Sequence, residues 1–151
     1  EGRILQALDV QPGESVLEIG TGSGFFAACL AALGGRVRTL EIHAELAAFA
    51  AANLRAAGHA GTTIVTADAM QWAPRERYDV VALTASLPVY DERFQAMLNV
   101  GGRLFAVVGE GAAMTALLIT RAGEREFARQ SLFETRIDPL LHAQTPPRFV
   151  F

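Results

Sequence analysis

The sequence predicts a single α/β domain built on a doubly wound, mostly parallel sheet, and three observations lead to this prediction. The chain has 151 residues, and one domain typically takes about 100–200. Hydrophobic residues make up 51% of the chain and charged residues 19%, which is enough apolar material for a core. Short apolar runs of strand length alternate with segments of helical pattern, and this alternation favours a parallel sheet covered on both faces.

The first elements surround a glycine-rich segment. A helix is expected over residues 3–8 from the spacing of its apolar residues, and a Pro-Gly pair ends it. Residues 15–19 (SVLEI) have the pattern of a short buried strand. Residues 25–33 are apolar nearly throughout and stop at a Gly-Gly pair, which is typical of a helix with a glycine stop.

The next three elements continue the alternation. Residues 36–42 alternate between polar and apolar side chains and form the second expected strand. Residues 44–57 are rich in alanine, with one apolar face and a glycine at the end, and predict a helix. Residues 62–66 are β-branched and predict the third strand.

The second half of the chain predicts two more parallel strands and a closing hairpin. Residues 78–84 (YDVVALT) form the fourth expected strand, and residues 91–98 a short helix. The fifth strand is expected over residues 103–108. Two antiparallel strands, over residues 115–121 and 126–137, then close the sheet around a short loop.

The composition excludes several classes of function. A net charge of −3 argues against a general nucleic-acid binder. All 13 basic residues are arginines, so lysine-dependent Schiff-base and phosphate-loop chemistry is excluded. A single cysteine, Cys29, allows no internal disulfide, and the scattered histidines lead us to expect no metal site. The longest apolar stretch is shorter than the about 20 residues of a membrane span, so we expect a soluble, cytoplasmic protein without a membrane or nucleic-acid partner.

A glycine-rich loop after the first strand is the central motif. In EIGTGSG, residues 18–24, three glycines directly follow the strand, so the chain can turn tightly with no side chain over a ligand. This geometry suits dinucleotides and S-adenosylmethionine. The dinucleotide pattern G-x-G-x-x-G fails at Phe25, and the Glu18 carboxylate would repel a diphosphate but attract the ammonium and sulfonium groups of S-adenosylmethionine. The alternative is a tight turn with a structural role only.

Two further acids follow the next strands. Glu41 ends the second strand about 20 positions after the first glycine, a spacing that suits an acid accepting hydrogen bonds from ribose hydroxyls, and Ile42 beside it would pack on the adenine. Asp68 directly follows the third strand and would accept from the adenine amino group, with Ala69 against the ring. A solvated charge for Glu41 and a helix N-cap for Asp68 stay open as alternatives.

The segment after the fourth strand, residues 84–88 (TASLP), is expected to be a loop beside the transferable group. In it, Thr84 and Ser86 are the catalytic candidates, through contact with the cofactor or the acceptor; the alternative is that they cap local backbone. The predicted cofactor-binding residues are Glu18, Gly20, Thr21, Gly22, Ser23, Gly24, Glu41, Ile42, Asp68 and Ala69.

These motifs resemble class I S-adenosylmethionine-dependent methyltransferases, and more closely the protein-L-isoaspartate O-methyltransferase family. The resemblance rests on VLEIGTGSGFFAACLAALGG, LEIHAELAAFAAANL, TADA, YDVVALTASLP and NVGGRLFAVVGEG, and the tail FETRIDPLLHAQTPPRFVF resembles a bacterial branch of that family. The resemblance implies a Rossmann-like fold, S-adenosylmethionine as cofactor, and protein or peptide substrates that carry isoaspartate, with protein repair as the role.

The resemblance also implies a segment before the first strand that holds substrate contacts. We therefore expect residues 1–151 to form one domain that lacks this segment. Leu87 is bulkier than the small residues usual at its position in the family. The leading hypothesis is a carboxyl O-methyltransferase, in which a substrate carboxylate attacks without needing a general base. The alternatives are a methyltransferase with another acceptor, either a small molecule or a different protein side chain, and a cofactor-binding module without turnover.

Overall fold

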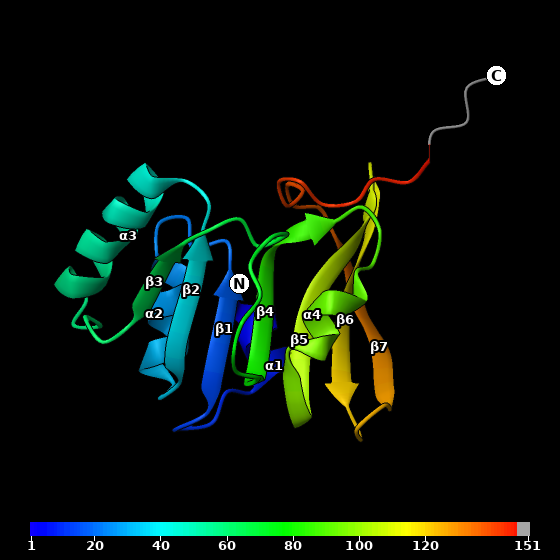
Figure 1. Cartoon of the computed structure of the whole chain (residues 1–151), viewed down its shortest axis with the longest axis horizontal. Helices are drawn as coiled ribbons and strands as arrows, with labels where there is room; N and C mark the ends of the chain where they lie inside the picture. The colour runs from blue at the N-terminus through cyan, green and yellow to red at the C-terminus, as the bar shows by residue number, and fades with distance from the viewer. Residues whose placement is uncertain (148–151) are drawn as a thin grey trace.

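The computed structural model describes residues 1–147, so the last four residues of the tail lie outside the described residues. Helices and strands alternate along the first part of the chain, and strands alone follow in the last part (Figure 1). The elements are α1 (Gly2–Leu8), β1 (Ser15–Ile19), α2 (Phe25–Ala32), β2 (Arg36–Glu41), α3 (Ala44–Ala56), β3 (Thr63–Thr66), β4 (Tyr78–Leu87), α4 (Glu92–Ala96), β5 (Leu98–Glu110), β6 (Ala113–Arg121) and β7 (Phe127–Thr135).

The strands form one mixed sheet in the order β3-β2-β1-β4-β5-β6-β7. The first five of these pair in parallel, with β1 between β2 and β4. The pairs β5–β6 and β6–β7 are antiparallel, which confirms the predicted mostly parallel α/β sheet with a C-terminal antiparallel hairpin. The winding direction changes between β1 and β4, and ligands of open α/β sheets bind at the carboxyl ends of the strands beside such a point.

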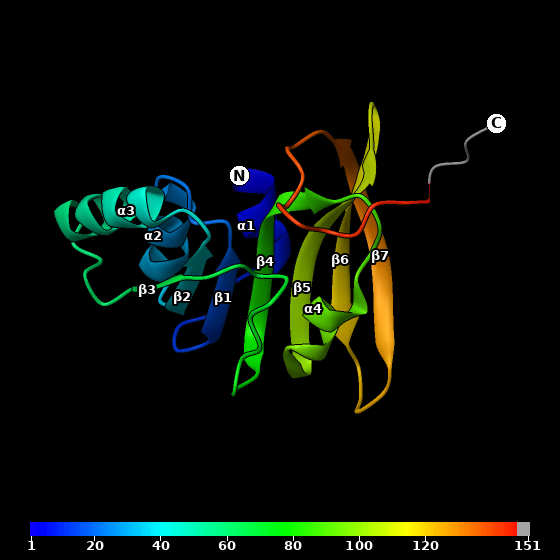
Figure 2. The ribbon, with the colours of Figure 1, turned by 45° about the horizontal axis from the view of Figure 1, so that its top comes forward.

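Two hydrophobic clusters cover the two faces of the sheet. Helices α1, α2 and α3 pack on one face, through residues such as Leu8, Phe26 and Leu54 (Figure 2). The other face is covered by Phe94 of α4, by Trp72 of the β3–β4 connection and by part of the tail. No helix of residues 1–147 is long and apolar enough to cross a membrane.

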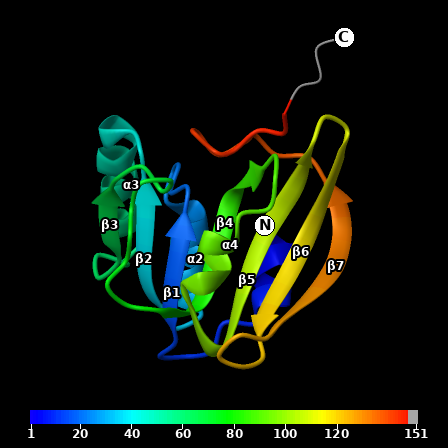
Figure 3. The ribbon, with the colours of Figure 1, turned by 45° about the vertical axis from the view of Figure 1, so that its right-hand side comes forward.

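The largest differences from the sequence prediction lie in β4 and β5. The prediction that residues 84–88 form a loop is wrong, because β4 continues to Leu87 and pairs again with β5 after an irregularity in the register. Strand β5 begins at Leu98, not at residue 103, because its first residue pairs with Tyr78. Figure 3 shows β5 and β6 as a long hairpin at this side of the sheet.

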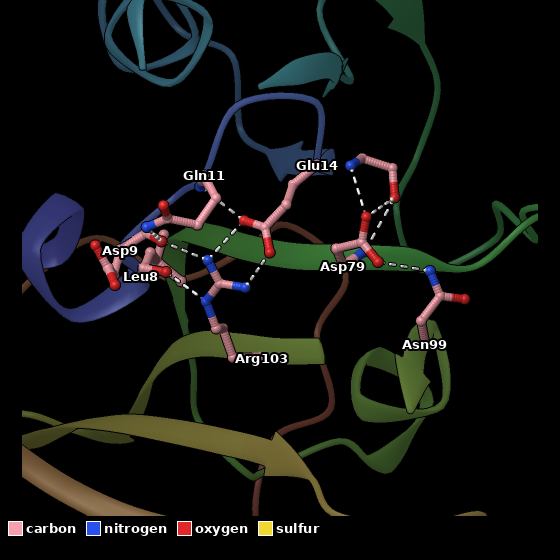
Figure 4. A network of polar contacts seen from close by, with 8 residues as sticks. Leu8, Asp9, Gln11, Glu14, Asp79, Asn99 and Arg103 are labelled. Carbon is pink, nitrogen blue, oxygen red and sulfur yellow. Dashed lines mark hydrogen bonds and ion pairs between the residues drawn. The ribbon is translucent and has the colours of Figure 1, made fainter. Parts of the chain in front are cut away.

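A polar network ties α1 to the sheet (Figure 4). Arg103 of β5 donates one hydrogen bond to each oxygen of the Glu14 carboxylate, both over 2.7 Å. The same guanidinium donates to the main-chain carbonyls of Leu8 and Asp9 at the end of α1. These hydrogen bonds from Arg103 hold the pKa of Glu14 below its ordinary value. One mostly buried side chain therefore fixes both the end of α1 and the turn that leads into β1.

Replacing this guanidinium is expected to destabilise the fold. Arg103→Met removes four hydrogen bonds and leaves the Glu14 carboxylate without its ion pair. A hydrogen bond to a charged group contributes about 1.5–3 kcal/mol net, and the contributions of bonds within one network do not add. Urea unfolding followed by circular dichroism is expected to show a loss of about 2 kcal/mol. Arg125→Met, at an exposed position of the β6–β7 turn, is the control. Equal stability of the two variants would contradict the structural role of Arg103.

Candidate functional site

The glycine loop lies between the ends of β2 and β4. The N–H groups of Gly20 and Thr21 both donate to the carbonyl of Leu40, over 2.9 and 3.1 Å. From the other side, the Thr84 hydroxyl donates to the carbonyls of Ile19 and Gly20, over 3.0 and 2.6 Å. The loop is therefore held at the carboxyl edge of the sheet by main-chain contacts to β2 and by one side chain of β4.

Each glycine of the loop occupies its position for a different physical reason. Gly20 has a φ of +101°, and a Cβ there would collide with the Thr84 hydroxyl, so the close approach requires glycine. Gly22 has a φ of +52°, and a Cβ there would meet nothing within 4 Å, so this part of the loop is an open surface. Gly24 approaches helix α3, where a Cβ would lie 3.2 Å from the Ala50 Cβ. Only the middle of the loop is free to receive a ligand.

Glu18 lies inside the protein, beneath this loop. Its side chain is 0% exposed, Oε2 accepts from the Thr39 hydroxyl over 2.6 Å, and Oε1 makes no hydrogen bond within residues 1–147. The Thr21 and Thr39 hydroxyls are 2.6 Å apart, so a chain of hydrogen bonds joins Glu18 to the loop. Burial is the main reason that the pKa of Glu18 is raised to about 8. The hydroxyl of Thr21 is thus turned inward, although the sequence nominated this residue for the cofactor.

Glu41 contacts the glycine loop directly. Its Oε2 accepts from the Gly22 N–H over 3.0 Å, and its Oε1 accepts from the His43 N–H over 3.1 Å. The carbonyl of Glu41 accepts from the Ala67 N–H over 2.9 Å, which brings Asp68 to the neighbouring position at the same edge. Glu41 is therefore a buried acid that shapes the loop, not a solvated strand-end charge, and each of its oxygens keeps a further lone pair.

Asp68 begins a turn, not a helix. Its Oδ1 accepts from the Met70 N–H over 2.9 Å, while Oδ2 lies 2.7 Å from Nδ1 of His142 in the tail. Ala69 is buried, and its N–H makes no hydrogen bond to the described part of the chain. Ile42 is half-buried. The structure thus brings Glu41, Ile42, Asp68 and Ala69 to one edge, as the sequence predicts.

The remaining predicted residues are Ser23, Thr84 and Ser86. Ser23 is exposed, and its carbonyl accepts from Asn53 of α3 over 2.8 Å. The Thr84 hydroxyl donates to the carbonyls of Ile19 and Gly20 at the start of the glycine loop. Ser86 is 0% exposed, and its hydroxyl donates to the Ile137 carbonyl over 3.1 Å. The expectation that Thr84 and Ser86 lie on a loop open to substrate is corrected here, because β4 continues through both and their hydroxyls bond main-chain carbonyls.

Two polar residues of the site escaped the sequence analysis. Thr39 is fully buried in β2, and because this strand carries polar residues at several positions, no local pattern marks it. His142 lies in the tail, which has no periodic pattern, and only the three-dimensional structure brings it to Asp68.

A largely apolar cavity of about 530 Å³ lies beside residues that hold and follow the glycine loop. Thr84 lines it together with Phe26 at the start of α2 and Phe133 of β7. Arg3 of α1 also lines it, with its guanidinium carbon 4.2 Å from the centre of the Phe133 ring. The cavity therefore offers apolar walls next to the carboxyl end of β4, and its charged lining residues are Arg3, Glu1 and Glu134.

The raised pKa of Glu18 predicts a pH effect on stability. The folded chain keeps the Glu18 proton up to about pH 8, whereas the unfolded chain releases it above about 4.5, so this group costs stability as the pH rises through that window. Glu18→Gln removes the titration and is expected to flatten the fall in unfolding free energy between these values, as measured by urea unfolding. Glu45→Gln, at an exposed position of α3, is the control. A wild-type slope in Glu18→Gln would contradict the buried, neutral form.

Comparison with known proteins identifies the family. Residues 1–144 match the family model described as protein-L-isoaspartate(D-aspartate) O-methyltransferase. Relatives named protein-L-isoaspartate O-methyltransferase include one from Rhodopseudomonas palustris, 38% identical over 143 residues, with 93% of this chain and 66% of the relative covered. One from Koribacter versatilis is 35% identical, with 94% and 64% covered. The chain thus spans just under two thirds of the length of these relatives.

Solved structures have the same fold. A Plasmodium falciparum structure described as a protein-L-isoaspartate O-methyltransferase in complex with S-adenosyl-L-homocysteine has a TM-score of 0.79 and 20% identity, and the match covers 92% of this chain and 70% of that one. A second solved structure, of a protein named protein-L-isoaspartate O-methyltransferase, has a TM-score of 0.80 and 23% identity, with 91% and 45% covered. The family match extends over nearly the whole chain, from α1 through the glycine loop to the tail. The chain belongs to the protein-L-isoaspartate(D-aspartate) O-methyltransferase family.

Proposed function

We propose that this chain binds S-adenosylmethionine and serves the methylation of isoaspartyl carboxylates in proteins, as part of protein repair in the cytoplasm. The family membership supports the reaction, and the S-adenosyl-L-homocysteine in the Plasmodium falciparum structure supports the cofactor. The observation that carries the proposal is the pair of carboxylates, Glu41 and Asp68, at neighbouring strand ends beside the open Gly22 surface.

The two acids have the chemistry that adenosine requires. Glu41 is oriented by two main-chain N–H groups, and its remaining lone pairs can accept from ribose hydroxyls. The Asp68 carboxylate lies next to the Ala69 N–H, so the chain presents an acceptor beside a donor. The amino edge of adenine offers the complementary pair, a donor at N6 and an acceptor at N1. We assign Asp68 and Ala69 to this edge, and Ile42 to the face of the ring.

Glu18 supports a cationic cofactor over a diphosphate. A buried carboxyl group ionises more readily when a positive charge approaches, because the opposite charge stabilises the charged form. A diphosphate would instead keep Glu18 protonated and would find no basic side chain in the loop sequence EIGTGSG. Through Thr39 and Thr21, Glu18 is also connected to the loop backbone. This arrangement fits the ammonium and sulfonium groups of S-adenosylmethionine.

The residues of this chain have the tasks of orientation and water exclusion. When bound, S-adenosylmethionine supplies an electrophilic methyl group. An isoaspartyl carboxylate is already ionised and nucleophilic at neutral pH, so no general base is needed, and alignment contributes most of the rate. We assign the acceptor to the cavity beside Thr84, where apolar walls limit water. Thr84 and Ser86 then act by fixing the glycine loop and the tail.

The first test is cofactor binding. S-adenosylhomocysteine at about 100 times its dissociation constant is expected to stabilise the fold by about 2.7 kcal/mol, visible as a thermal shift, and NAD is expected to give none. Glu41→Ala is expected to weaken binding about 10–100-fold in calorimetry, because a charged hydrogen bond is lost. Glu45→Ala, at an exposed position of α3, is the matched control. A shift with NAD and none with S-adenosylhomocysteine would refute the assignment.

The second test is the acceptor. Radiolabelled methyl transfer is compared between an isoaspartyl peptide and an aspartyl peptide of the same sequence. Transfer to the isoaspartyl peptide is expected to exceed transfer to the other at least about tenfold, because a shift of about 1 Å in the reacting atom can cost about 100-fold in rate. Tight cofactor binding with no transfer to either peptide would point to a different acceptor.

A further inference from the structure

We propose that His142 of the tail is a positioning residue, which orients the Asp68 carboxylate and thereby makes the site select an adenine amino group. The inference rests on the proposed function, since it concerns the adenine end of the same site. The observation that carries it is the contact of 2.7 Å between Nδ1 of His142 and Oδ2 of Asp68, two residues that are 74 positions apart in the chain.

The tail is anchored on both sides of His142. After β7 the chain crosses the carboxyl edge of the sheet (Figures 1 and 2). There the Ser86 N–H donates to the Asp138 carbonyl, and the Leu140 N–H donates to the Ser86 carbonyl, both over 2.8 Å. Leu140 and Ala143 pack against the hydrophobic cluster on the α4 face. His142 is therefore placed by the fold, as the end of β4 and the core fix its neighbours.

The backbone of His142 supports a specific placement. Its φ is +63°, in the left-handed region, which few residues other than glycine adopt. Such a conformation persists where the surrounding structure enforces it. The side chain of Asp68 is 14% exposed and that of His142 is 64% exposed. The ring thus reaches Asp68 from the solvent side and leaves the carboxylate as the more buried partner.

Two contacts fix the orientation of the Asp68 carboxylate. The Met70 N–H holds Oδ1 and His142 holds Oδ2, so the group cannot rotate without losing one of them. Both contacts also lower the pKa of Asp68, with His142 as the larger cause. An ionised carboxylate only accepts hydrogen bonds. It therefore binds the 6-amino group of adenine and disfavours the 6-oxo group of hypoxanthine, which is itself an acceptor.

The test compares two ligands that differ at this one position of the base. S-adenosylhomocysteine and S-inosylhomocysteine are titrated by calorimetry into wild type, His142→Ala and His142→Asn. We expect His142→Ala to weaken the binding of S-adenosylhomocysteine about tenfold, because one oriented hydrogen bond to the amino group is lost. The affinity for S-inosylhomocysteine is expected to stay unchanged. His142→Asn keeps an N–H donor and is expected to restore most of the affinity. Leu141→Ala, an exposed neighbour, is the control and is expected to change neither.

The outcomes separate this inference from the proposed function. If wild type binds S-adenosylhomocysteine and His142→Ala binds it equally well, the inference fails and the proposed function stands. Equal weakening of both ligands would overturn the inference in favour of a general structural role of the tail. Tighter binding by His142→Ala would overturn it in favour of competition between the tail and the cofactor. No binding of S-adenosylhomocysteine to wild type would overturn both.

Discussion

The carbonyl of Leu40, at the end of β2, is the point around which the site is assembled. It accepts the N–H groups of both Gly20 and Thr21, and this double contact turns the chain out of β1 across the edge of the sheet. Because Glu41 directly follows, its carboxylate lies within reach of the Gly22 N–H. The contact requires β1 and β2 to be paired in parallel and in register, with Ile19 opposite Leu40. A slip by one residue would remove the acceptor and the acid together.

The buried carboxyl group of Glu18 lowers the stability of the fold at this site. A buried carboxyl group with one oxygen unpaired within residues 1–147 is unfavourable unless a partner arrives. Buried titratable groups with shifted pKa values are typical of functional sites. Thr39 and Thr21 limit the cost, since their hydroxyls give the acid one hydrogen-bonded route to the loop. The unfavourable group and the open glycine surface lie at the same edge, as expected where function competes with packing.

The sequence was sufficient for the parts of the fold that depend on local pattern. Apolar runs and glycine stops located β1, α2 and α3 closely, and the spacing of the acids after the glycine loop placed Glu41 and Asp68 at one edge of the sheet. The sequence was insufficient where the structure of a segment depends on pairing with residues far away in the chain. Residues 84–87 continue β4 because Ser86 and Leu87 pair with Val107 and Val108 of β5 and because the tail lies beside them. The local sequence pattern does not identify these distant partners. The direction of the Thr21 and Thr84 hydroxyls and the contact of His142 with Asp68 depend on the same kind of long-range placement.

The connection from β3 to β4 has a practical consequence. Residues 67–77, all of them described, cross the sheet without a helix. The face that a helix would cover is therefore covered by α4, by Trp72 of this connection and by the returning tail. Leu140 and Ala143 therefore pack against the core of this domain, and a fluorophore or fusion partner attached to residues 138–143 would disturb this packing together with the contact between His142 and Asp68. The β6–β7 turn lies at the opposite end of the sheet (Figure 1), and its exposed residues Glu124 and Arg125 offer a place for labels in single-molecule or surface-immobilisation work.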